Sequence, residues 1–439
     1  MAQSSGRVDS VAPASFTAGG NRYRIEGSRL IFDGGSQSMD YYVGSNAAGR
    51  SYLWARDGYL FESPITWYAR KQIWDLSPGF ERISGIQLTR PIEPSCLLCH
   101  ASRVRPVLGS QNRYGDPPFL DNGVACERCH GPGSEHVRDP GRARMVNPKD
   151  LAAELRDSIC EQCHLTGEAR VERAGRRLAE FRAGERLADY ATYLVWDTDR
   201  RDMKVTSHVE KLAQSACKRS SGDALWCGTC HDPHTNANKT QAACLGCHAA
   251  AHHAEQSCAA CHMPESPVAD DGGHGVMTDH SIPARMRSPD SSPAHGNLRA
   301  FLGIDDDRAL GIAYAQLGDA RAREYLLRAK PADADVALRL AFLEQDPSRA
   351  AALYESVLRA SPAQPVALVN LGIVLARAGR LQDAARLWAR ALTANPAIEE
   401  AALNLARIQP AAEARATLRR YLEFNPLSEA ARARLKAIH

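Results

Sequence analysis

Six pentapeptides of the form Cys-x-x-Cys-His carry the clearest chemistry in this sequence. Two cysteines three residues apart can form thioethers with the two vinyl groups of one porphyrin, and the adjacent histidine can bind the iron. Zinc hooks and redox dithiols also use Cys-x-x-Cys, but they need no following histidine. Histidine occupies 15 of 439 positions, so a histidine after all six pairs is not expected by chance. The motifs therefore predict six covalently bound haem c groups.

The motifs assign a thioether pair and a proximal iron ligand to each haem. The predicted thioether cysteines are Cys96, Cys99, Cys126, Cys129, Cys160, Cys163, Cys227, Cys230, Cys244, Cys247, Cys258 and Cys261. The predicted proximal ligands are His100, His130, His164, His231, His248 and His262. One cysteine, Cys217, is left without a partner at haem spacing, so we expect a buried small side chain there and no disulfide framework.

Each iron also needs a ligand on its far side, and histidines outside the motifs are the candidates. His234 follows His231 by three residues and cannot easily reach round the same porphyrin, so we expect it to serve a neighbouring haem. The same argument applies to His136, which follows His130 closely. The full candidate set is His136, His208, His234, His274 and His280, with His252 or His253 as the sixth and His295 in reserve. We assign no catalytic residue.

The composition limits the class of protein and its compartment. The formal charge of +3 omits about two propionates per haem, so the holoprotein is expected to be acidic, and nucleic-acid binding has no support. No run of eighteen apolar residues predicts a membrane span. Haem c is attached outside the cytoplasmic membrane, yet the first twenty residues lack a secretory pattern. We expect a periplasmic or extracellular protein whose leader has been removed or lies upstream of residue 1.

The elements that must position these residues fall into three expected domains. Residues 1–92 predict a small antiparallel β module, with a hairpin bend at Arg56-Asp57-Gly58. Residues 93–296 predict a hexahaem domain with short helices and loops, in which cofactors replace a side-chain core. Residues 297–439 predict an all-α solenoid of tetratricopeptide-like repeats. The fold class is therefore multi-domain.

The repeat prediction depends on a helical period and on spaced prolines. Pro331, Pro362, Pro396 and Pro426 are separated by 31, 34 and 30 residues, close to the 34-residue tetratricopeptide unit. The consensus positions of one unit are occupied by Leu368, Leu371, Gly372, Leu375, Ala384, Trp388, Ala391 and Pro396. We expect these helices to close their own core and to be separable from the haem domain.

With these features the chain resembles the multihaem c-type cytochromes that carry C-terminal tetratricopeptide repeats. The resemblance rests on Gly123 to His136, Cys227 to His234, Cys261 to Pro264 and Thr278 to Pro283, together with segments of the β module. It implies that His136 and His234 are distal ligands. Relatives usually begin with a further haem motif, which this chain lacks, and Met1 to Ser4 resembles the stretch just after it.

Two functions follow from these expectations. The first is electron transfer along six closely spaced, mostly bis-histidine haems, with the repeats binding redox partner proteins or mediating self-assembly, including a filament. The alternative is a multihaem oxidoreductase acting on a small nitrogen or sulfur compound. That chemistry requires one iron with an open distal position, whereas an iron with two histidines moves electrons and resists substrate binding.

Overall fold

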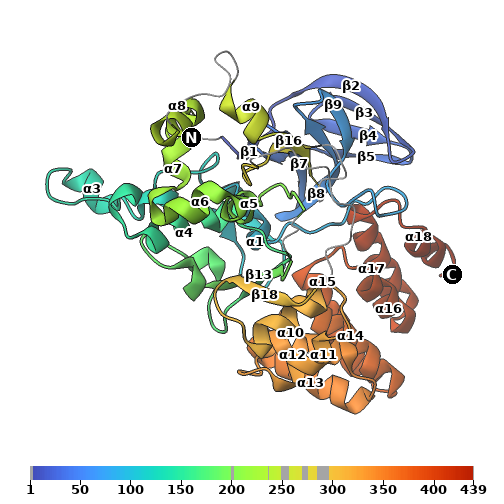
Figure 1. Cartoon of the computed structure of the whole chain (residues 1–439). Helices are drawn as coiled ribbons and strands as arrows, with labels where there is room; N and C mark the ends of the chain where they lie inside the picture. Colours follow the sequence, from blue (N-terminus) through green and yellow to red (C-terminus); the bar gives the residue numbers. More distant parts are fainter. Residues whose placement is uncertain are drawn as a thin grey trace.

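The computed structural model describes residues 3–198, 202–235, 237–248, 257–268, 275–283 and 296–438. Figure 1 shows a β-rich N-terminal part, a central part of short helices and loops, and a helical C-terminal part that contacts both. Among the described helices, none is long and apolar enough to cross a membrane.

The N-terminal part consists of two antiparallel sheets that share one apolar core. The first sheet has the strand order β1 (Ser5–Arg7), β6 (Tyr41–Val43), β7 (Gly49–Arg56), β8 (Tyr59–Tyr68) and β9 (Ile73–Leu76). The second has the order β2 (Val11–Ala18), β3 (Asn21–Gly27), β4 (Arg29–Phe32) and β5 (Gly35–Ser38). Strands β7 and β8 meet at Asp57 and Gly58, whose φ values of 53° and 81° form the expected tight hairpin bend.

The central part contains short helices, small sheets and single-turn 3-10 helices. Its helices are α1 (Pro94–Leu97), α2 (Glu127–His130), α3 (Ser134–Arg138), α4 (Ala153–His164), α5 (His208–Gln214), α6 (Ala216–Ser221), α7 (Cys227–Cys230), α8 (Thr240–Cys247) and α9 (Cys258–His262). Its strand pairs are β10 (Val104–Pro106) with β11 (Tyr114–Phe119), β14 (His231–Asp232) with β15 (Ala237–Asn238), and β16 (Glu265–Pro267) with β17 (Val276–Thr278). Short elements of this kind agree with the prediction for residues 93–296.

The C-terminal part is a series of antiparallel helices. They are α10 (Asp307–Gln316), α11 (Ala322–Arg328), α12 (Ala334–Leu343), α13 (Pro347–Ala360), α14 (Pro365–Arg377), α15 (Leu381–Ala394), α16 (Glu399–Ile408), α17 (Ala411–Phe424) and α18 (Glu429–Lys436). A Cβ added at Gly372 would lie 2.4 Å from Nε1 of Trp388, so the glycine lets α14 and α15 approach closely. This is the close packing that the repeat pattern predicts.

The repeats also pack against the rest of the chain at both ends, which corrects the expectation of a separable unit. At the start, β18 (Leu298–Leu302) extends a sheet of β12 (Ala169–Glu172) and β13 (Ala191–Trp196). The side chain of Arg308 in α10, only 5% exposed, donates to the Glu172 carbonyl oxygen at 2.8 Å and pairs with Asp333 at 2.7 Å. The predicted domain boundary at residue 297 therefore lies next to strand β18, which belongs to a sheet shared with the haem segment.

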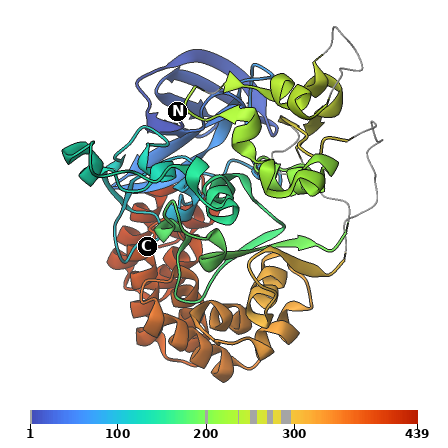
Figure 2. The same ribbon diagram turned by 60° about the vertical axis from the view of Figure 1, so that its left-hand side comes forward.

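At the other end, α17 covers the β module. Phe424 is fully buried against Trp54, Tyr59 and Phe61, with ring-centre distances of 6.4, 6.1 and 5.9 Å. The Tyr59 hydroxyl donates to the Thr393 carbonyl oxygen at 2.6 Å. Figure 2 shows the helical repeats alongside both other parts. Helices α10 and α17 thus bury apolar surface that a repeat domain alone would leave exposed.

Candidate haem centres

Each Cys-x-x-Cys-His motif lies on or directly after a helical turn. In the second motif the His130 amide donates to the Cys126 carbonyl oxygen at 3.0 Å, and in the fifth motif the His248 amide donates to the Cys244 carbonyl oxygen at 2.9 Å. Residues three and four apart share one face of a helix. Such a turn therefore presents two thiols and one imidazole to the same side, as attachment of a single porphyrin requires.

Motif histidines lie next to histidines from distant parts of the chain. The ring centres of His130 and His234 are 5.8 Å apart and their planes differ by 16°. A metal–imidazole bond is about 2 Å long, so two imidazoles on one metal have ring centres about 6 Å apart. The first pair therefore has the spacing of two ligands on one iron.

Two further pairs have similar spacing. His231 and His280 have ring centres 6.1 Å apart, and His164 and His208 have ring centres 5.1 Å apart. The rings of His208 and His280 are also close, at 4.8 Å, so the third and fourth motifs share one group of four imidazoles. Helix α5 brings His208 to this group, and the turn after β17 brings His280.

Backbone carbonyls orient several of these imidazoles. Nδ1 of His130 donates to the Val146 oxygen at 2.7 Å, and Nδ1 of His280 donates to the Thr278 oxygen at 2.8 Å. Because a carbonyl can only accept, the proton must be on Nδ1, which leaves the lone pair of Nε2 for a metal. The same bond forms from His136 to the Ala143 oxygen at 2.8 Å and from His262 to the Pro283 oxygen at 3.0 Å.

Burial keeps other imidazoles in the neutral form that binds metals. It lowers the pKa of His208 to about 3, helped by the nearby imidazole of His164. It also lowers the pKa of His100, His164 and His231. A neutral imidazole has a free lone pair, whereas a protonated one cannot ligate.

Thiols of different motifs lie in contact. Cys99 of the first motif and Cys163 of the third form a thiol–thiol hydrogen bond, and so do Cys160 of the third and Cys227 of the fourth. Cys244 and Cys258 of the last two motifs form another. The third motif therefore touches the first with one cysteine and the fourth with the other, although the second motif lies between the first and third in sequence.

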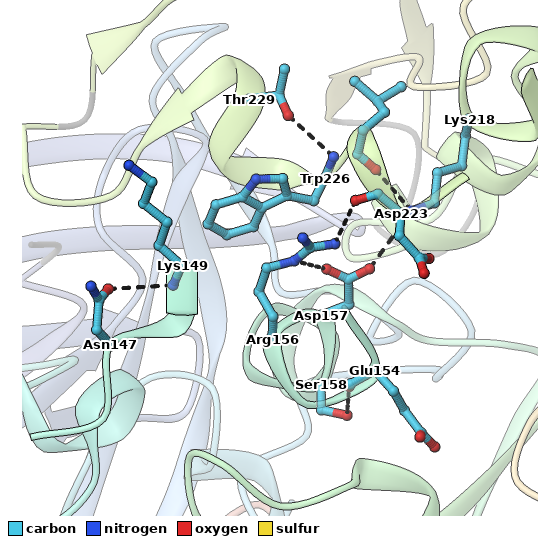
Figure 3. A network of polar contacts seen from close by, with 11 residues as sticks. Asn147, Lys149, Glu154, Arg156, Asp157, Ser158, Lys218, Asp223, Trp226 and Thr229 are labelled. Atoms are coloured by element: carbon cyan, nitrogen blue, oxygen red, sulfur yellow. Dashed lines mark hydrogen bonds and ion pairs between the residues drawn. The ribbon is translucent and has the colours of Figure 1, made fainter. Parts of the chain in front are cut away.

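A polar network holds the third motif against the fourth (Figure 3). In α4, the Arg156 side chain donates to Asp157 at 2.8 Å and to the Asp223 carbonyl oxygen at 3.1 Å, and it lies over the Trp226 ring at 4.8 Å. Lys218 pairs with the same Asp157 at 3.6 Å. Trp226 directly precedes Cys227, so this network fixes the distance between two attachment sites.

The residues present fit haem c, because each motif offers two thiols and an imidazole and several distal imidazoles have a free Nε2. Of the predicted distal ligands, the structure brings His208, His234 and His280 to motif histidines and orients His136 on α3. His252, His253, His274 and His295 lie outside the described residues. Sequence reasoning missed the carbonyls that orient the rings, since every residue carries one and no residue type marks them.

Comparisons with known proteins agree with this chemistry. The family model "Cytochrome c554 and c-prime" matches residues 79–131, which include the first two motifs. The multiheme cytochrome MtrA of Shewanella baltica (strain OS185) is 28% identical over 176 residues, which cover 35% of this chain and 52% of that protein. The chain thus spans about half the length of this curated relative.

Solved structures similar to this chain include repeat proteins. A MamA structure is 22% identical with a TM-score of 0.27 and covers 29% of this chain and 76% of its own. A tetratricopeptide repeat protein from Parabacteroides merdae is 21% identical with a TM-score of 0.25. The match covers 28% of this chain and 54% of that protein. The resemblance to multihaem c-type cytochromes with tetratricopeptide repeats is confirmed. Covalently bound haem c is the cofactor that the motifs and the two cytochrome sequence matches imply.

Proposed function

We propose that this protein transfers electrons outside the cytoplasmic membrane through six haem c groups, most of them with two histidine ligands. The observation that carries the proposal is the placement of His130 beside His234, His231 beside His280 and His164 beside His208 at ligand-pair spacing. Haem c supplies reversible one-electron chemistry at its iron. The protein would supply two imidazoles to such an iron and would hold the attachment sites close together.

The remaining motif histidines, His100, His248 and His262, need other partners. The candidates are His136, whose ring is oriented by the Ala143 oxygen, and the histidines at 252, 253 and 274. Two histidine ligands leave no position for a small substrate, so this ligand set favours electron transfer over the oxidoreductase alternative.

The thiol contacts support a path that departs from sequence order. Cys99 and Cys163 join the first motif to the third, and Cys160 and Cys227 join the third to the fourth. Cys244 and Cys258 join the last two motifs, and Cys230 of the fourth lies near Cys244. We infer the order first, third, fourth, fifth, sixth, with the second motif beside this line through His130 and His234.

The repeats support a role in binding redox partners or in self-assembly, including a filament. Repeat helices present extended surfaces, and here they are held rigidly by packing at both ends. Partner binding at the repeats is therefore compatible with a fixed arrangement of the attachment sites.

The experiment combines haem counting with carbon monoxide binding. Intact mass should exceed the polypeptide mass by six haems, and the reduced protein should bind no carbon monoxide. His234→Ala removes one distal imidazole, so it should create a single carbon monoxide site and a high-spin signal. His439→Ala, which changes a histidine outside the predicted ligand set, should create no carbon monoxide site.

Stoichiometric carbon monoxide binding by the unmodified protein would contradict the proposal and favour the oxidoreductase alternative. A mass increase of five haems or fewer would show that a motif is not used. If His234→Ala behaves as the unmodified protein does, the assignment of His234 to the second motif is wrong.

A further inference from the structure

Two arginines lie beside the contact between the first and third motifs. Arg128 and Arg170 both act electrostatically on the Cys99 thiol, which is hydrogen-bonded to the Cys163 thiol. Among the described residues, neither guanidinium has a carboxylate within salt-bridge distance. Unpaired cations at a partly buried position are unusual, because burial of a charge is unfavourable without a counter-charge.

Arg128 connects three motifs. It is an intervening residue of the second motif, and its Nη2 donates to the Leu98 carbonyl oxygen of the first motif at 3.1 Å. Its own carbonyl oxygen accepts from the Gln162 side chain of the third motif at 3.5 Å. Its Nε is buried and has no hydrogen-bond partner among the described residues. Part of this guanidinium therefore remains available to an acceptor.

Arg170 approaches from the other side. It lies in β12, directly opposite Tyr193 of β13. It lines a cavity of about 350 Å³ together with Cys99, Cys163 and Gln162. The Tyr193 ring is fully buried beside it, and the Arg170 guanidinium acts electrostatically on the Tyr193 hydroxyl. The cavity thus joins the second cysteines of two motifs to a guanidinium.

The acidic groups around this cavity are already engaged. Glu168 lines the cavity but pairs with Lys204 at 2.8 Å. The Glu210 carboxylate accepts the backbone N–H groups of Thr166, at 2.9 Å, and Gly167. The charge that remains beside Cys99 and Cys163 is therefore positive.

The opposite end of the third motif has a different balance of positive and negative side chains. Near Cys160 and Cys227, Asp157 is paired with both Arg156 and Lys218. Glu161 is partly buried, and desolvation raises its pKa to about 7. Acidic and basic groups thus offset one another there. The two junctions of the third motif differ in charge, and the positive one faces the first motif.

We propose that Arg128 and Arg170 raise the reduction potentials of the haems attached at the first and third motifs, so that electrons collect at this end of the path. Reduction adds one negative charge, and a nearby fixed cation stabilises the reduced form more than the oxidised form. The proposal rests on the proposed function and assigns two positioning residues that no sequence motif marks.

The test compares charge removal at the junction with the same change nearby. Midpoint potentials are measured by optical titration of the full holoprotein carrying Arg170→Gln, Arg128→Gln or both. We expect two midpoints to become more negative in each single variant and further in the double variant. Arg177→Gln removes an exposed charge just beyond β12 and should leave all midpoints unchanged, because solvent screens it. Arg170→Lys should restore most of the shift.

Midpoints in Arg170→Gln and Arg128→Gln that match those of Arg177→Gln would overturn the proposal. A midpoint shift in Arg170→Lys as large as that in Arg170→Gln would also overturn it. The charge is kept in Arg170→Lys, so that result would indicate a change of packing. If Arg170→Gln retains fewer haems than the unmodified protein, the test is made with Arg128→Gln and Arg128→Lys instead. The midpoint shifts expected of these two variants are the same as those stated for Arg170→Gln and Arg170→Lys. The haem count and carbon monoxide binding of the unmodified protein do not depend on these midpoints, so failure here is distinct from failure of the proposed function.

Discussion

Replacement of Phe424 by alanine should show that the repeats and the β module unfold together. Phe424 is fully buried and contacts Trp54, Tyr59 and Phe61 of the β module. Its position in α17, far from the β strands in sequence, makes it a contact between two parts of the protein. Loss of this side chain therefore reports on the interface.

The size of the effect follows from burial. Full burial of a phenylalanine contributes about 3 kcal/mol, and a cavity left by Phe→Ala brings the loss to about 4 kcal/mol. With a urea dependence of about 3 kcal/mol per M, the unfolding midpoint should fall by roughly 1 M. The three aromatic neighbours place the cavity at the interface, where few side chains can move to fill it.

The assay is urea unfolding followed by far-ultraviolet circular dichroism. The matched control is Phe342→Ala, since that ring is 57% exposed and its removal should cost about 1 kcal/mol or less. A Phe424→Ala midpoint equal to that of Phe342→Ala would refute the reasoning and would restore the view of the repeats as a separable domain.

Two further changes test the attachment sites. Gly228→Ala places a Cβ 2.3 Å from the Trp226 ring, so haem content at the fourth motif should fall by mass spectrometry. Gly246→Ala, at the second intervening position of the fifth motif with open space around it, should retain all haems. Cys217→Ser should leave the haem count unchanged, because Cys217 has no histidine or cysteine at haem spacing, and loss of a haem in this variant would contradict that assignment.

Some features of the fold could be predicted because they depend on residues close in sequence. The bend at Asp57 and Gly58 needs two positive φ angles, and Gly58 accepts one without strain. Gly372 opposite Trp388 follows from the repeat consensus, which is itself a local packing rule. The packing of the repeats against the other two parts could not be predicted, since no property of Phe424 or Arg308 within its helix indicates which strand it contacts.

The sequence by itself determined the cofactor and predicted its attachment sites, because thioether formation and proximal ligation need only two cysteines and a histidine within one helical turn. It also determined a set of distal histidines but could not pair them. Only the tertiary structure placed His234 beside His130, joined the third motif to the first through Cys163 and Cys99, and brought Arg128 and Arg170 to that junction. The physical reason is that these contacts are made between segments far apart in the chain, whose approach depends on the packing of the whole molecule.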